Sequence, residues 1–183
     1  MMPVVIAMLR AVNVGGRNRI KMDVLRDLCM GLDLRDAKTY VQSGNLIFRA
    51  KERSLVGLAA TIQTAIEKKF KCSPEVILRT TAEMRDVVAR NPFAGMKDMD
   101  PRKLLVDFLA SEPDAEALRS VQSIKTDPEK LYAQGREIYM YFPNGAGRSK
   151  LSWPAIEKRL KTPGTARNWN SVTKLLEMAE SYE

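Results

Sequence analysis

The chain has 183 residues, of which 45% are hydrophobic and 28% charged, and it carries a formal net charge of +8 with no histidine. These values are typical of a globular protein with one large or two small domains, and they exclude disordered and fibrous classes. A basic chain favours anionic partners such as nucleotides, phosphorylated metabolites or nucleic acid, although its basic residues are mixed with acidic ones rather than gathered in a run.

The missing histidine excludes much catalytic chemistry. It removes the Ser-His and Cys-His nucleophile pairs, the usual zinc sites and the commonest general base near neutral pH. The two cysteines, Cys29 and Cys72, are too few for a disulfide framework or a four-ligand metal site. We expect both to be small buried hydrophobes, with a reactive thiol as the alternative. The sequence thus predicts no metal site and no cofactor, and it leaves open whether the protein is an enzyme.

No segment has the character of a membrane anchor or a secretory signal. The apolar residues 4–9 form a run far shorter than the ~20 residues that a membrane helix needs. The run also lacks the basic flank and the cleavage site of a signal peptide. We therefore expect a cytoplasmic protein that does not associate with membranes.

The first half predicts the order strand, helix, strand, strand, helix, strand. Residues 3–9 are apolar on both alternating faces, as in a central strand that is covered on both sides. Gly44 supplies the positive φ of a tight hairpin, Ser54 is a favourable N-cap, and Thr80 with Glu83 forms a capping box for a third helix. Strands are expected at residues 3–9, 37–42, 45–49 and 74–79, and helices at residues 21–30, after residue 54, and from residue 80 to before 91. This βαββαβ order is that of the ferredoxin-like unit.

The second half predicts a similar order. Residues 93–101 resemble a loop and are the best candidate boundary, so we expect one domain at residues 1–92 and a second at residues 93–183. The second domain is expected to have strands at residues 103–109, 131–134 and 137–142, and helices at residues 113–121, after residue 152 and at 170–179. This βαββαα order repeats the first half, with a helix in place of the final strand. The fold class is therefore α+β, with a ferredoxin-like unit followed by a second α/β unit.

A short match of letters bears on whether the two halves are a duplication. Tyr40-Val41-Gln42-Ser43-Gly44 in the first hairpin is similar to Tyr132-Ala133-Gln134-Gly135 in the second. A match of this length also arises by chance, so duplication stays a hypothesis.

Three polar loops are candidate binding segments. Residues 10–19 follow the first strand, contain Gly15-Gly16 and are close to Lys21; Gly-rich turns before helices often bind phosphate through free amides. The loop is neither a P-loop nor a dinucleotide fingerprint, so turn geometry alone is the competing interpretation. The second loop has Arg148-Ser149-Lys150 after two glycines. The third has Arg167, and it has Asn168 and Asn170, either of which is also a natural helix N-cap.

The βαββαβ order also raises RNA binding, because RNA-recognition domains share it. Such domains stack bases on aromatic residues of the first and third strands. Here the first strand has no aromatic residue and the third has only Phe48. Nucleic acid is therefore a disfavoured partner.

Several segments with distinctive motifs follow one another along nearly the whole chain: residues 9–16, 20–22, 40–45, 148–151 and 165–172. Together they resemble the bacterial family known as domain of unknown function 1697. Ala11 and Ala166 depart from the residues that the family usually has there. The resemblance implies a compact α/β fold with ferredoxin-like elements and no established activity. Its signature residues are Arg10, Asn13, Gly15, Gly16, Asn18, Lys21, Gln42, Ser43, Asn45, Arg148, Ser149, Lys150, Arg167, Asn168 and Asn170.

These signature residues are polar or basic and lie in loops, where they indicate a site more than packing. The leading hypothesis is a ligand-binding protein, or an enzyme, whose polar basic cleft takes a phosphate- or carboxylate-bearing small molecule. Arg10, Lys21, Arg148 and Arg167 would supply charge. A nucleic-acid-binding module and a structural or partner-binding protein are the alternatives. The sequence does not determine the ligand, any reaction or the oligomeric state.

Overall fold

The computed structural model describes residues 2–51 and 54–182. The chain divides into two compact units, Met1–Arg85 with Lys174–Glu183 (unit 1) and Asp86–Thr173 (unit 2). Both divisions fall inside helices, α3 (Thr81–Ala89) and α6 (Trp169–Glu180), and not in the loop at residues 93–101. Among the described residues, no helix combines the length and apolar composition needed to cross a membrane.

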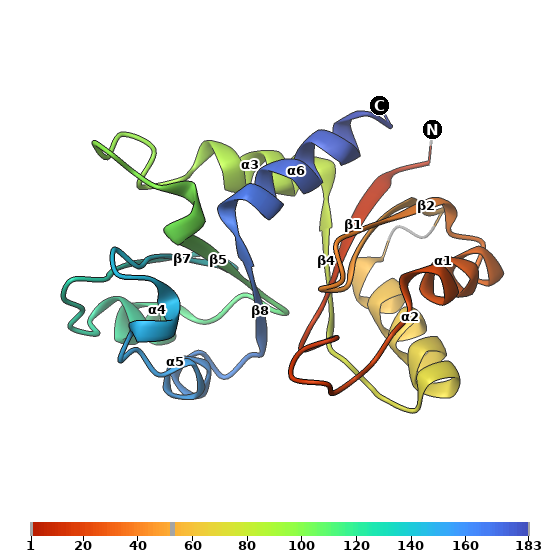
Figure 1. Cartoon of the computed structure of the whole chain (residues 1–183), viewed down its shortest axis with the longest axis horizontal. Helices are drawn as coiled ribbons and strands as arrows, with labels where there is room; N and C mark the ends of the chain where they lie inside the picture. The colour runs from red at the N-terminus through yellow and green to blue at the C-terminus, as the bar shows by residue number, and fades with distance from the viewer. Residues whose placement is uncertain (1, 52–53, 183) are drawn as a thin grey trace. The chain divides into compact units, whose positions relative to one another are not determined.

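Unit 1 contains one four-stranded antiparallel sheet in the order β2-β3-β1-β4 (Figure 1). Its elements are β1 (Val4–Leu9), α1 (Met22–Gly31), β2 (Arg35–Tyr40), β3 (Asn45–Arg49), α2 (Leu55–Phe70) and β4 (Val76–Thr80). The predicted βαββαβ order is confirmed, with β2 beginning two residues earlier than expected. Every residue of β1 is buried, as the apolar pattern on both of its faces predicts.

One face of this sheet packs against α1 and α2, which lie on the same side of the strands (Figure 1). Leu25 and Cys29 of α1 and Ile62 of α2 are fully buried with the alternate residues of β1, Ala7 and Leu9. The two helices show the spacing of apolar residues that buries one helical face. Ser54 caps α2 by accepting a hydrogen bond from Gly57 N, as predicted.

Unit 2 contains a second four-stranded antiparallel sheet in the order β6-β7-β5-β8. Its elements are β5 (Leu104–Leu109), α4 (Ala115–Gln122), β6 (Lys130–Gln134), β7 (Glu137–Tyr141), α5 (Trp153–Leu160) and β8 (Gly164–Asn168), with two short 3-10 helices, η1 (Pro101–Lys103) and η2 (Ala146–Arg148). The expected order βαββαα is wrong at its end, because β8 precedes the last helix. The order is βαββαβ, followed by α6.

The missed strand lacks the features by which strands are recognised in sequence. β8 begins at a glycine after Pro163, and its residues Gly-Thr-Ala-Arg-Asn contain no large apolar side chain. It forms because all five residues pair with β5, the buried central strand. Tertiary pairing thus overrides a weak local preference.

The apolar core of unit 2 lies between its sheet and helices α4 and α5. Leu109, Val121 and Ile156, from β5, α4 and α5, are buried together there. Asp107 of β5 is also buried, on the face of the sheet that Leu109 shares. A Cβ added at Gly164 would lie 2.5 Å from its Oδ1 atom, so this glycine makes room for the carboxylate.

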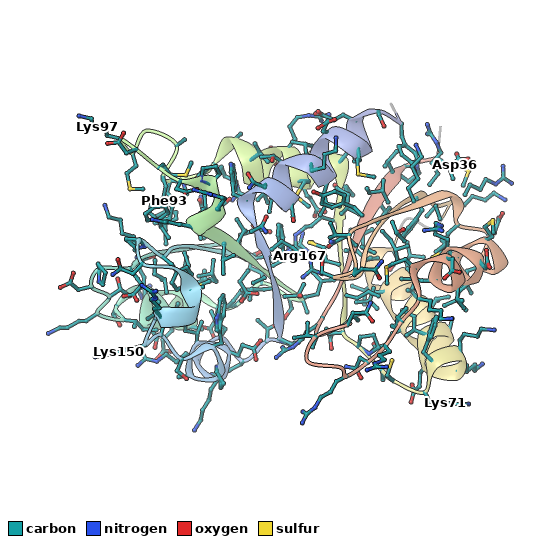
Figure 2. The ribbon with its side chains drawn as sticks, in the orientation of Figure 1. Asp36, Lys71, Phe93, Lys97, Lys150 and Arg167 are labelled. Carbon is teal, nitrogen blue, oxygen red and sulfur yellow. The ribbon has the colours of Figure 1, made fainter. Side chains whose placement is uncertain are left out.

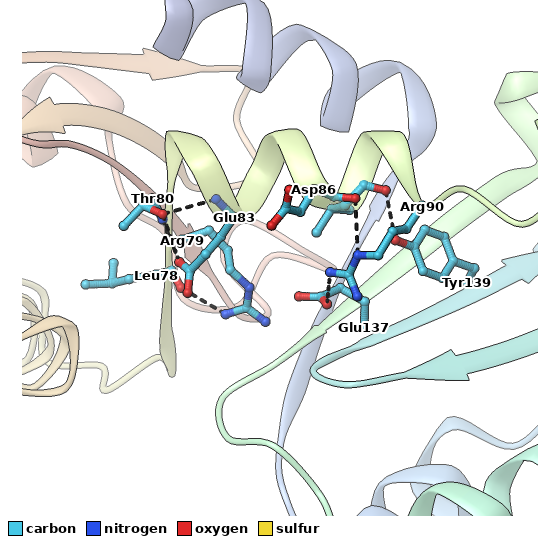
Figure 3. Close-up of polar contacts among 9 residues, drawn as sticks. Leu78, Arg79, Thr80, Glu83, Asp86, Arg90, Glu137 and Tyr139 are labelled. Carbon is cyan, nitrogen blue, oxygen red and sulfur yellow. Dashed lines mark hydrogen bonds and ion pairs between the residues drawn. The ribbon is translucent and has the colours of Figure 1, made fainter.

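Helix α3 begins as predicted and has polar contacts at both ends (Figure 3). Thr80 Oγ1 accepts from Glu83 N over 3.1 Å, and Glu83 Oε2 accepts from Thr80 N over 2.8 Å, which is a complete capping box. At the other end, Tyr139 Oη donates to Val87 O over 2.8 Å. Arg90, just after the helix, lies 3.5 Å from the buried carboxylate of Glu137.

Tyr182, which follows α6, packs against the sheet of unit 1. Tyr182 Oη donates to Asp36 O over 2.6 Å, and the Arg49 guanidinium donates to the carbonyl oxygen of Tyr182. Lys38 Nζ lies 4.8 Å from the centroid of the Tyr182 ring, within the range of a cation–π contact. A tyrosine near the end of the chain is therefore part of the packing of unit 1.

The two sheets support the duplication hypothesis through their registers. Ile6 of β1 pairs with Arg79 of β4, and Val106 of β5 pairs with Arg167 of β8. The two pairs occupy the same positions within their strands. The matching letters of the two hairpins are not equivalent, however. Tyr40 pairs with Asn45 at the end of its hairpin, whereas Tyr132 pairs with Tyr139, two positions from the turn.

The first prediction concerns Gly164. In Gly164→Ala, the new methyl group would overlap the Asp107 carboxylate, so we expect the free energy of unfolding to fall by about 1–3 kcal/mol in urea denaturation. Gly147→Ala is the control, because nothing lies within 4 Å of its added Cβ, and its effect should stay within about 0.5 kcal/mol. In an Asp107→Ala background, Gly164→Ala should cost little. A loss of equal size in that background would contradict the proposed overlap.

Candidate functional site

The connection between β1 and α1, residues 10–21, is held in an unusual backbone shape; we name it the basic loop. Five residues have φ between +47° and +75°: Ala11, Asn13, Gly15, Gly16 and Asn18. Gly15 and Gly16 form a tight turn that Arg17 N closes by donating to Val14 O over 3.1 Å. Left-handed backbone costs of the order of 1 kcal/mol or more at a non-glycine residue. Hydrogen bonds around the loop must offset this cost.

Asn13 provides most of these hydrogen bonds. Its Nδ2 donates to Ile20 O over 2.9 Å and to Gln42 O over 2.8 Å, while its Oδ1 accepts from Ile20 N over 2.9 Å. Asn18 Nδ2 donates to Ala11 O over 3.1 Å across the same loop. Asn13 therefore joins the basic loop to the turn between β2 and β3, and both asparagines shape the backbone.

The turn that Asn13 reaches, residues 41–44, is itself strained. Val41 has φ +52°, which is rare for a β-branched residue, and Gly44 has φ +75°. A Cβ at Gly44 would lie 2.8 Å from that of Leu9, so only glycine fits there. Asn45 Nδ2 donates to Tyr40 O over 3.1 Å and to Ser43 Oγ over 3.0 Å. Ser43 and Asn45 thus fix the turn from within.

The basic loop is strongly positive. Residues 10–21 include Arg10, Arg17, Arg19 and Lys21 and no acidic residue. Arg10 is half-buried, and the other three are exposed. Within residues 2–51 and 54–182, those three side chains form no salt bridge. Two exposed valines accompany them, Val14 (63% exposed) on the loop and Val41 (50%) on the adjoining turn.

The second polar loop, in unit 2, lies around η2. Arg148 and Lys150 are exposed and line a cavity of about 370 Å³ together with Asp127 and Glu129. Ser149 Oγ accepts from Leu151 N over 3.1 Å, so its hydroxyl stabilises the loop. Acidic neighbours at this loop distinguish it from the basic loop of unit 1.

The third polar segment is largely structural. Arg167 is buried and donates to Thr165 Oγ1 and to Ala166 O, over 2.8 and 2.9 Å. Burial lowers the pKa of Arg167 to about 10, and the Asp107 carboxylate opposes this shift, so the guanidinium stays charged at neutral pH. Asn168 Oδ1 accepts from Ser171 N over 2.8 Å and caps α6, while Asn170 is exposed on the first turn.

The structure brings together some of the signature residues within each unit and separates others. In unit 1, Asn13 connects the basic loop to the turn that carries Gln42 and Ser43. In unit 2, Lys150 belongs to a loop after β7, and Arg167 is buried in β8 at the other side of β5; Figure 2 shows the two well apart. These two loops of unit 2 therefore do not share one cavity.

Sequence reasoning missed three features of these sites. Val14 and Val41 look like ordinary apolar residues, and a left-handed valine has no signature in sequence. Asp127 and Glu129 lie far from Arg148 in the chain, and no motif connects them. Among the described residues, no group of three or more histidine, cysteine or acidic side chains is placed so that it could hold a metal ion.

The second prediction concerns Asn13. Asn13→Ala removes three partly exposed hydrogen bonds and releases the strained loop, so the free energy of unfolding should fall by about 1–3 kcal/mol. Asn170→Ala is the control, because Asn170 is exposed and its side chain makes no hydrogen bond in the described parts of the chain. Backbone amide hydrogen exchange should increase across residues 11–20 in Asn13→Ala only. Unchanged exchange would show that Asn13 does not hold the loop.

The third prediction concerns the cysteines. Burial raises the pKa of the Cys29 thiol to about 12 and also raises that of the half-exposed Cys72. Because the thiolate is the reactive form, Cys29 should resist a thiol reagent such as Ellman's reagent at pH 8, and Cys72 should react first. In Cys72→Ser, the folded protein should show no rapid labelling until denaturant is added. Rapid labelling of that variant would contradict the burial of Cys29.

Comparisons with known proteins agree with the fold. Residues 2–139 match the family described as "Protein of unknown function (DUF1697)". The chain is also similar to a solved structure, conserved bacterial protein SP0830 from Streptococcus pneumoniae, with a TM-score of 0.73 and 22% identity over 98% of this chain and 99% of that one. A search of curated proteins finds no match. The chain therefore belongs to the DUF1697 family, as the sequence motifs of its loops indicate.

Proposed function

We propose that this protein binds an anionic ligand, carrying a phosphate or carboxylate group, at the basic loop and the adjoining turn of unit 1. The observation that carries the proposal is the strained, exposed loop whose cations Arg17, Arg19 and Lys21 have no acidic neighbour within residues 10–21. Val12 and Ile20 anchor this loop in the core of unit 1, while the three cations stay exposed on a loop that contains left-handed backbone. Strain of this kind concentrates at binding and switching segments.

The residues of the site have different roles in this proposal. Arg10, Arg17, Arg19 and Lys21 supply the positive charge, and guanidinium groups suit both phosphate and carboxylate because they donate two parallel hydrogen bonds. Asn13, Asn18, Ser43 and Asn45 hold the backbone, and Gly15 and Gly16 provide the turn. Gln42 is exposed, and its main-chain carbonyl oxygen accepts from Asn13 Nδ2.

The proposed activity is binding rather than catalysis. The basic loop has no histidine and no carboxylate, so it offers no general base near neutral pH. Cationic groups held on a rigid loop raise the local concentration of anions and lose little conformational entropy on binding. Exposed Val14 and Val41 add apolar contact area next to the charges.

The fourth prediction tests this proposal by thermal denaturation. Potassium phosphate or citrate, added at constant ionic strength, should raise the melting temperature until the site is saturated. An anion concentration of ~100 times the Kd increases the free energy of unfolding by about 2.7 kcal/mol. For a chain of this size that amounts to roughly 5–10 °C. The triple variant Arg17→Gln, Arg19→Gln, Lys21→Gln should lose most of this shift.

The control variant is Lys97→Gln, Lys125→Gln, Lys158→Gln, which removes the same charge from exposed positions elsewhere. It is needed because phosphate and citrate also stabilise proteins by exclusion from their surfaces. Equal shifts in the two triple variants would reject the site. A short single-stranded oligonucleotide forms a separate arm: binding to it that weakens steeply with salt, without a phosphate effect, would favour a nucleic-acid module instead.

A further inference from the structure

Unit 2 has a cavity of about 370 Å³ that carries charges of both signs, and we name it the charged cavity. Two segments line it, one before β6 and one after β7. The lining residues are Asp127, Pro128, Glu129, Asn144, Arg148 and Lys150. Its volume is within the range of small-molecule sites.

The sheet explains why these two segments meet. β6 and β7 are antiparallel, and Lys130 at the start of β6 pairs with Tyr141 at the end of β7. The residues before Lys130 and after Tyr141 therefore leave the sheet at the same end. Successive hydrogen bonds then fix the second segment: Gly145 N donates to Phe142 O, Arg148 N to Gly145 O, and Ser149 N to Ala146 O, over 2.9 to 3.2 Å.

The four charged side chains do not neutralise one another. No salt bridge joins Asp127 or Glu129 to Arg148 or Lys150 in the part of the chain that the structure describes. Asp127, Arg148 and Lys150 are exposed and Glu129 is half-buried, so all four charged groups are accessible to a ligand from solvent. Here two carboxylates and two cations remain separate around a common volume.

This arrangement selects against ligands with a single charge. An anion that approached Arg148 and Lys150 would be repelled by the two carboxylates, and a metal or organic cation at Asp127 and Glu129 would be repelled by the two basic groups. A molecule with both an ammonium and a carboxylate group satisfies both pairs. We propose that the charged cavity binds a small zwitterion, such as an amino acid or a short peptide, with its carboxylate on Arg148 and Lys150 and its ammonium on Asp127 and Glu129.

This site is separate from the proposed anion site, since it involves no residue of the basic loop. It also separates Arg148 from Arg10, Lys21 and Arg167, the cations with which the sequence hypothesis places it in a single cleft. The amide of Asn144 adds a neutral donor and acceptor to the same lining.

The fifth prediction is tested by titrating ¹⁵N-labelled protein with glycine, diglycine and triglycine, in which the distance between the charged ends increases. At least one of them should produce saturable shifts in the amide signals of residues 127, 129 and 144–151. Acetate and methylammonium at matched ionic strength should bind about tenfold more weakly or less. Equal shifts with acetate would identify a simple anion site and overturn the proposal, as would no saturable shift with any peptide.

Two double variants test the two charge pairs. Asp127→Asn, Glu129→Gln should weaken the zwitterion by about tenfold while strengthening acetate binding, because the repulsion is removed. The double variant Arg148→Gln, Lys150→Gln should abolish binding of both the zwitterion and acetate. The matched controls are two further double variants at exposed positions elsewhere in unit 2. Glu112→Gln with Glu116→Gln matches the acidic pair, and Lys125→Gln with Lys158→Gln matches the basic pair. The amide spectra also show whether each variant is folded; an effect as large in the controls would overturn the assignment.

Discussion

The constraint on which the structure depends is the antiparallel pairing of a buried central strand with two neighbours in each unit. β1 lies between β3 and β4, and β5 lies between β7 and β8. The central strand fixes the direction and the register of its neighbours on both sides. The last strand of each unit therefore forms even where its own residues do not favour a strand. β8 is the clearest case, since all five of its residues pair with β5 although none is large and apolar. Pairing within a sheet thus determines whether a segment forms a strand more strongly than the local preference of its residues does.

The same registers show how closely the two units correspond. Arg79 and Arg167 lie opposite equivalent apolar residues, both are buried, and each donates to the carbonyl oxygen of the residue before it over 2.9 Å. The next residues, Thr80 and Asn168, both cap the helix that follows. Differences between the units are compensated. The small Ala7 pairs with Leu78, whereas at the equivalent positions the larger Asp107 pairs with Ala166 and has room for its carboxylate at Gly164. Such paired exchanges of size preserve a close-packed interior.

The sequence predicts the parts of this fold that depend on periodicity and capping. A run of residues that are apolar on both faces identifies β1, and the pair Thr80 and Glu83 identifies the start of α3. Interactions between distant residues escape it. The repeated order of elements predicts two similar units, but the matching letters of the two hairpins lie at different register positions. The closer correspondence is in strand pairing, which no short match of letters reveals. The strain at Val41 arises from backbone geometry, which the sequence does not show. Asp127 and Arg148 line one cavity because their segments leave the same end of a sheet, which no motif indicates.

The proposed sites lie where the two units differ most. The connection after the central strand spans residues 10–21 in unit 1 but only residues 110–114 in unit 2. For the connection after the third strand of each unit, the longer one is in unit 2: it spans residues 142–152 there but only residues 50–54 in unit 1. The shorter connection of each pair has five residues, so five residues are enough to join these elements. The longer ones add to the cores through Val12 and Ile20 in unit 1 and Phe142 in unit 2. Their exposed residues carry the basic loop in one unit and much of the charged cavity in the other, as expected if each unit binds a different ligand.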